Sequence, residues 1–68
     1  MHLYLVERKG DTPSGETSGM VIAAPSPPRA RAEAVKHAGN EFSTAATSKV
    51  TDIGVGKGPV RVIFTSKG

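Results

Sequence analysis

The residues that could do chemistry in this 68-residue sequence are a glycine-rich stretch, two histidines and six acidic side chains. The stretch GVGKGP, residues 54–59, holds a lysine between glycines, as phosphate-binding loops do. Such a loop has the spacing G-x-x-x-x-G-K-[ST] and opens a helix. Here Gly58 and Pro59 follow Lys57, and a strand-like segment comes next. The stretch therefore predicts a turn between two strands.

The histidines and acids form no catalytic or metal-binding pattern. His2 and His37 each lack a second ligand at the spacing of zinc sites, and there is no cysteine to supply a thiolate. The acidic residues form no paired motif, and no base is placed beside a serine or threonine nucleophile. We therefore expect a protein that is not an enzyme and has no metal and no cofactor.

The balance of charge favours an acidic partner. Nine Lys and Arg residues against six Asp and Glu give a net charge of +3, with an isoelectric point near 9.7. Such a balance suits nucleic acid or an acidic protein surface, although +3 is also an ordinary charge for solubility. No run of 18 apolar residues and no signal-peptide pattern is present, so we expect a cytoplasmic location and no membrane partner.

Four segments have the alternation and composition of strands. They are HLYLVER (2–8), MVIAA (20–24), KVTDIGV (49–55) and VRVIFTS (60–66). In the last segment Val60, Val62 and Phe64 fall on one face, which places Phe64 in the core. Of the aromatic residues, only Tyr4 is then left to stack on a base of a nucleic acid.

One helix is expected between the second and third strands. Ser26 is placed to cap it with its side chain, and Pro27 and Pro28 suit its first turn. Good helix formers continue to Ala38, and Gly39 stands where a left-handed residue ends a helix. Its apolar stripe consists mainly of alanines, which lets the helix lie close to a sheet. We expect Phe42 to fold back on the end of this helix.

Arg31 falls within the alanine stripe of this helix, and two interpretations are open. Its stem can cover apolar surface while the guanidinium reaches water or a carboxylate at the end of the sheet. Alternatively, the guanidinium is held out for a carboxylate or phosphate of a partner. Replacing Arg31 with alanine separates the two interpretations.

The order of these segments is strand, strand, helix, strand, strand. It predicts a single domain, residues 1–68, of the α+β class. We expect two layers, a mainly antiparallel four-stranded sheet with one helix packed on one face.

Three segments together resemble a known group of proteins. LYLVER, VIAAPSPPRARAEA and DIGVGKGPVRVIFTSKG are similar to segments of small proteins from bacteriophages and other mobile elements. Pro27 and Pro28 stand where acidic residues are commoner in that group. The size and strand–helix–strand plan also resemble small phage anti-CRISPR proteins, which act by occupying a surface of a CRISPR effector complex. This resemblance implies a function but assigns no site residue.

The leading hypothesis is a phage-encoded inhibitor that binds a host defence complex, such as a CRISPR–Cas effector, through a basic surface. Arg29, Arg31, Lys36 and Arg61 are the predicted partner contacts. One alternative is a nucleic-acid-binding accessory protein of weak specificity. Another is a structural or virion-associated protein that adds a strand to a partner or forms a homodimer.

Overall fold

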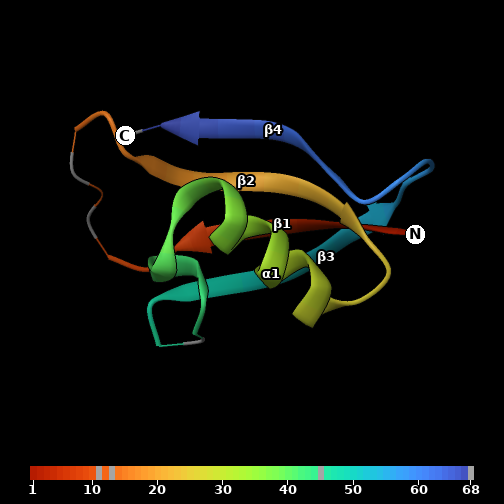
Figure 1. Cartoon of the computed structure of the whole chain (residues 1–68), viewed down its shortest axis with the longest axis horizontal. Helices are drawn as coiled ribbons and strands as arrows, with labels where there is room; N and C mark the ends of the chain where they lie inside the picture. The colour runs from red at the N-terminus through yellow and green to blue at the C-terminus, as the bar shows by residue number, and fades with distance from the viewer. Residues whose placement is uncertain (11, 13, 45, 68) are drawn as a thin grey trace.

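A computed structural model of the chain shows one antiparallel sheet with a helix on one face (Figure 1). It describes residues 1–10, 12, 14–44 and 46–67. The elements in chain order are β1 (His2–Arg8), β2 (Thr17–Ala24), α1 (Pro27–Ala38), the short 3₁₀ helix η1 (Asn40–Phe42), β3 (Ser48–Val55) and β4 (Arg61–Lys67). The α+β class and the ββαββ order predicted from the sequence are confirmed.

The strand order is β3-β1-β2-β4, so β1 and β2 form a central hairpin and the last two strands are the sheet edges. The central position of β1 accounts for its apolar residues on both faces, because each face of a central strand has neighbours on two sides. β1 has its predicted bounds. β2 begins three residues earlier than predicted, and the bounds of β3 and β4 each differ by one residue.

The helix begins and ends where predicted, but Ser26 does not cap it as expected. The Ser26 backbone is extended, and its carbonyl accepts a hydrogen bond from the Ala30 amide at 3.0 Å, while its side chain makes no capping hydrogen bond. Pro28 in the first turn has no amide hydrogen to offer. At the other end Gly39 has φ 105°, a conformation that favours glycine, and its amide donates to the Val35 carbonyl.

Because Ser26 makes no capping hydrogen bond, we expect Ser26→Ala to change the free energy of unfolding by less than about 0.5 kcal/mol. Loss of a side chain that does cap a helix typically costs about 1 kcal/mol. Urea denaturation followed by circular dichroism measures this difference. A loss of about 1 kcal/mol or more would show that the serine hydroxyl caps the helix in solution.

The core lies between α1 and the sheet. Ala30 and Ala34 have no exposed surface and face the central hairpin, so the helix backbone approaches the strands closely. Phe42 from η1 fills the space beyond the alanines: η1 folds back against α1, as predicted for Phe42, and the side chain is fully buried. The small side chains of the helix and the one large side chain of η1 therefore close the same core.

The two aromatic residues that bear on function are placed opposite to expectation. Tyr4 is buried in the core, whereas Phe64 is 61% exposed. The exposure of Phe64 follows from an irregularity in β4. Phe64 pairs with Val21 and Val62 pairs with Ile22, which leaves Ile63 as an extra residue. A bulge of this kind reverses the alternation. Phe64 therefore lies on the face away from α1, and the prediction that it belongs to the core is wrong.

The GVGKGP stretch ends β3 and then carries the chain across to β4, from one edge of the sheet to the other (Figure 1). On the way the Gly56 amide donates to the Met1 carbonyl at 2.8 Å. A Cβ on Gly56 would lie 2.6 Å from a Leu3 methyl carbon, so a larger residue here would require the Leu3 side chain to shift. The prediction of a connection between strands is confirmed, but these strands are not neighbours.

Candidate functional site: a basic groove on the helix

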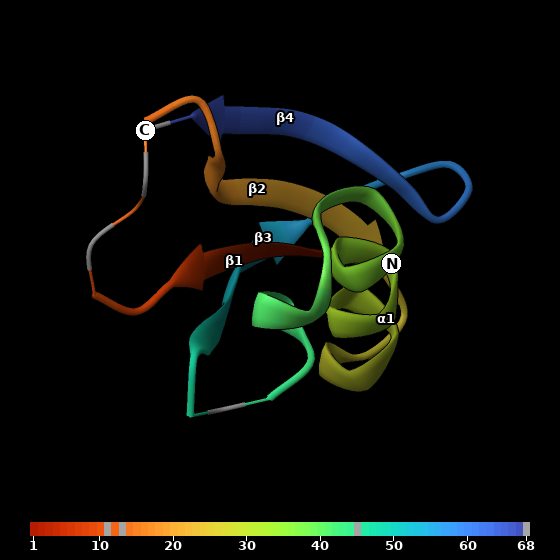
Figure 2. The ribbon, with the colours of Figure 1, turned by 60° about the vertical axis from the view of Figure 1, so that its left-hand side comes forward.

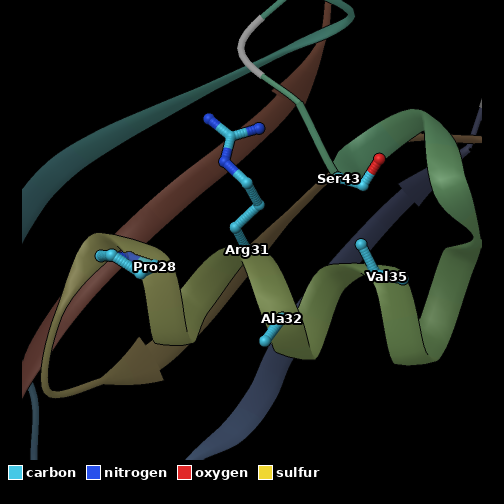
Figure 3. Close-up of a pocket in the computed structure, with 5 residues that line it drawn as sticks. All are labelled: Pro28, Arg31, Ala32, Val35 and Ser43. Atoms are coloured by element: carbon cyan, nitrogen blue, oxygen red, sulfur yellow. The ribbon is translucent and has the colours of Figure 1, made fainter.

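One of the four predicted contact residues, Arg31, lines a groove beside α1, and two others, Arg29 and Lys36, are exposed on the same helix. The groove has a volume of about 400 Å³ and is lined by Pro28, Arg31, Ala32, Val35 and Ser43. Figure 3 shows Arg31 leaving the helix between Pro28 at one end and Val35 with Ser43 at the other. Among the described residues of this lining most are apolar and none is acidic.

Arg29 and Lys36 do not line this groove, but both are helix neighbours of Ala32, which does. Each lies one helical turn from Ala32, at the i−3 and i+4 positions, which are neighbours on a helix surface. Both side chains are exposed. Arg31 lines the groove itself, so α1 carries one positive charge in the groove and two exposed ones beyond Ala32. Ala32 and Val35, which form its floor, were not predicted as functional residues.

Arg31 connects the helix to the segment that follows it. One of its terminal nitrogens, Nη1, donates to the Phe42 carbonyl at 3.2 Å and to the hydroxyl of Ser48. Ser48 is fully buried, and its hydroxyl donates in turn to the Thr44 carbonyl at 2.8 Å. The guanidinium therefore reaches backbone and hydroxyl acceptors, where the sequence suggested water or a carboxylate.

These two bonds use only part of the donor capacity of Arg31. A guanidinium carries five N–H donors, and here both hydrogen bonds come from Nη1. Nε and Nη2 donate to no described residue, and the side chain is half-buried at the groove. A carboxylate entering the groove would meet the remaining donors, beside apolar surface for a neighbouring side chain.

Arg61 lies elsewhere. It pairs with Ala23 across β4 and β2, on the face of the sheet away from α1, and its Nη1 donates to the Lys57 carbonyl at 3.0 Å. Arg8 is also engaged: its guanidinium stacks over Phe42 and faces Glu41. Of the four predicted contact residues, Arg29, Arg31 and Lys36 thus belong to α1, whereas Arg61 lies on the opposite face of the sheet.

The titratable side chains form isolated pairs. His2 lies 2.9 Å from Asp52, and His37 lies 3.7 Å from Glu33. Within residues 1–10, 12, 14–44 and 46–67, no three His, Cys, Asp or Glu side chains come together as metal ligands would. In the same ranges no helix has the length and apolar character needed to cross a bilayer.

Comparison of the chain with protein-family models, with curated proteins and with solved structures finds no match. The groove itself is therefore the basis for a functional proposal. The sequence indicates this groove only weakly. Ala32 and Val35 are two small or apolar residues between Arg29 and Lys36, which are seven positions apart on the helix. Nothing in the sequence predicts that Ser43 lines the groove, because its place there depends on how the chain folds back after Gly39.

Proposed function

We propose that this chain is a non-catalytic binding protein that attaches to an acidic partner protein through the groove on α1. The observation that carries the proposal is a mostly apolar groove on α1 that Arg31 lines and that has no acidic residue among its described lining; Arg29 and Lys36 are exposed on the same helix. Apolar contact supplies affinity, and the surrounding charges select a partner surface that bears carboxylates.

The resemblance of three segments to phage proteins supports a particular class of partner. On that basis we propose a host defence complex, such as a CRISPR–Cas effector, and an inhibitory role in the bacterial cytoplasm. The groove on α1 supports the proposal that the chain binds a partner protein. The resemblance to phage proteins is the sole support for a phage origin. A one-to-one complex that blocks a surface of the target requires no catalytic group in the inhibitor.

Nucleic acid is a poorer fit than protein for this surface. Tyr4, the aromatic residue expected to stack on bases, is buried, and the groove itself contains no aromatic side chain. Single-strand binding surfaces combine positive charge with aromatic platforms on the same face. Here Phe64 lies on the other face of the sheet from α1, so it cannot serve as an aromatic platform for the groove.

The test is capture of partners from a bacterial lysate by the immobilised chain, with and without nuclease. The double variant Arg29→Glu/Lys36→Glu places repulsive charge beside the groove, and we expect it to weaken capture at least about 30-fold. Lys57→Glu/Lys67→Glu is the matched control, because it makes the same change of charge at exposed residues away from α1.

Three results would contradict the proposal. Capture of no protein would remove it, and equal capture by both double variants would show that net charge, rather than the groove, holds the partner. Material that disappears with nuclease treatment would favour nucleic acid as the ligand.

A further inference from the structure

The face of the sheet away from α1 is uncovered. We call it the open face; its central residues are Leu3, Leu5, Val21 and Phe64, and its charged residues are Glu7, Lys49 and Arg61, as the strand pairing shows. In Figure 2, α1 and η1 lie on the other side of the sheet. Gly56 covers one end, at Leu3. No described helix or strand packs over the rest, where Leu5 and Val21 are partly exposed and Phe64 is exposed; Gly10 and Thr12 of the β1–β2 connection reach the hollow beside Phe64.

This face has both a projection and a hollow. Phe64 is 61% exposed, and the extra residue Ile63 beside it is 48% exposed. Next to Phe64 is a hollow of about 380 Å³ whose lining includes Leu5, Gly19 and Phe64 itself. Gly19 lacks a side chain between its cross-strand neighbours, which are Glu7 and Ser66. An exposed aromatic side chain thus lies beside a hollow large enough to receive one.

A projection and a hollow on the same face suit contact between two identical chains. A two-fold axis near Phe64 brings this side chain into the partner's hollow, where it meets the partner's Phe64, and both copies make the same contact. Aromatic pairs in such contacts are favourable beyond the area they bury.

The charges and the size of the open face agree with this occupant. The face bears both signs, so Glu7 of one copy can lie against a basic residue of the other. The molecule presents at most about 32 × 20 Å along its two longer axes, which limits the contact to roughly 640 Å² per copy. Two copies then bury up to about 1,300 Å², near the lower end of the ~1,200–2,000 Å² of stable interfaces.

We propose that the open face is a homodimer interface in which two sheets pack face to face around Phe64. The dimer then has four layers, with the helices outside and both α1 grooves exposed. This assembly does not depend on the function proposed for the groove, but it makes each particle bivalent for a partner.

The test is the mass of the protein in solution, measured by light scattering and sedimentation equilibrium over a range of concentrations. We expect a mass that rises to twice the 7.0 kDa of one chain. Phe64→Glu should weaken the dimer at least about 30-fold, as expected for the loss of a central aromatic contact. Circular dichroism should show that this variant stays folded, because Phe64 is exposed in one chain.

Val55→Glu is the matched control, since Val55 is 78% exposed and pairs with His2, away from the centre of the open face. It should form dimers like the wild type. A wild-type mass of 7.0 kDa at millimolar concentration would overturn the proposal. So would a folded Phe64→Glu variant that dimerises normally. Arg29→Glu/Lys36→Glu should remain dimeric, so failure of the groove proposal is distinguishable.

A second measurement separates face-to-face packing from pairing of β4 edges. A soluble nitroxide broadens the NMR signals of exposed methyl groups. In a face-to-face dimer the methyls of Leu5 and Val21 are protected and become accessible in Phe64→Glu. If the dimer forms by edge pairing, these methyls broaden equally in both proteins, and the proposed interface is wrong.

Discussion

Replacing Phe42 with alanine is expected to remove most of the stability of this protein. Phe42 is the largest side chain with no exposed surface, and it closes the core beyond Ala30 and Ala34. Truncating a buried phenylalanine costs about 3–5 kcal/mol. A domain of this size has only about 3–10 kcal/mol in total, at roughly 0.05–0.15 kcal/mol per residue. The variant should be unfolded, or melt at least about 15 °C lower than the wild type.

The chain contains its own control, because its other phenylalanine is exposed. Phe64→Ala should change the free energy of unfolding by less than about 0.5 kcal/mol when measured at a concentration where the protein is monomeric. Thermal melts followed by far-ultraviolet circular dichroism compare the two variants directly. If Phe64→Ala is the more destabilising of the two, the bulge in β4 is misplaced and Phe64 belongs to the core.

The contrast between these phenylalanines also marks the limit of sequence reasoning. Alternation in VRVIFTS placed Phe64 beside Val60 and Val62, and no residue of this segment indicates that Ile63 interrupts the pairing with β2. The bulge is a property of two paired strands, so a pattern within one strand cannot reveal it. Tyr4, by contrast, follows the alternation within β1, but its burial depends on α1 covering that face.

The residue preferences at helix ends were sufficient to predict the bounds of α1, because these bounds depend on local backbone conformation. Pro27 and Pro28 favour the start of a helix, and Gly39 adopts the positive φ that ends it. The strand order β3-β1-β2-β4 could not be predicted, because the long connection through Gly56 can join either neighbouring or distant strands. The groove could be predicted only in part: helical spacing places Arg31, Ala32 and Val35 on one side of α1, but Ser43 joins them through the tertiary fold.

Arg31 shows why a charge can stand in an alanine stripe. Its acceptors, Phe42 and Ser48, are 11 and 17 residues away in the sequence, so no local pattern indicates them. The small alanine side chains bring the helix close to the sheet, and the long arginine side chain spans from the helix to the start of β3. The same residue lines the groove with its remaining donors. Its structural role and its proposed contact role are therefore compatible.

We expect Arg31→Met to destabilise the protein by about 2–3 kcal/mol and to lower its melting temperature by roughly 10–20 °C. Methionine keeps an apolar stem along the helix but removes both charged hydrogen bonds, which leaves the Phe42 carbonyl without this donor. Arg29→Met is the matched control, because Arg29 is exposed on the same helix, and it should change stability by less than about 0.5 kcal/mol.

Capture experiments with the same two variants, at a temperature where both are folded, separate the two roles of Arg31. If the guanidinium serves the fold alone, Arg31→Met melts early but retains the partner as well as the wild type does. If it also binds a carboxylate in the groove, the folded variant loses the partner as well. Normal melting of Arg31→Met would contradict the structural role, because the bonds to Phe42 and Ser48 would then contribute nothing to the folded state.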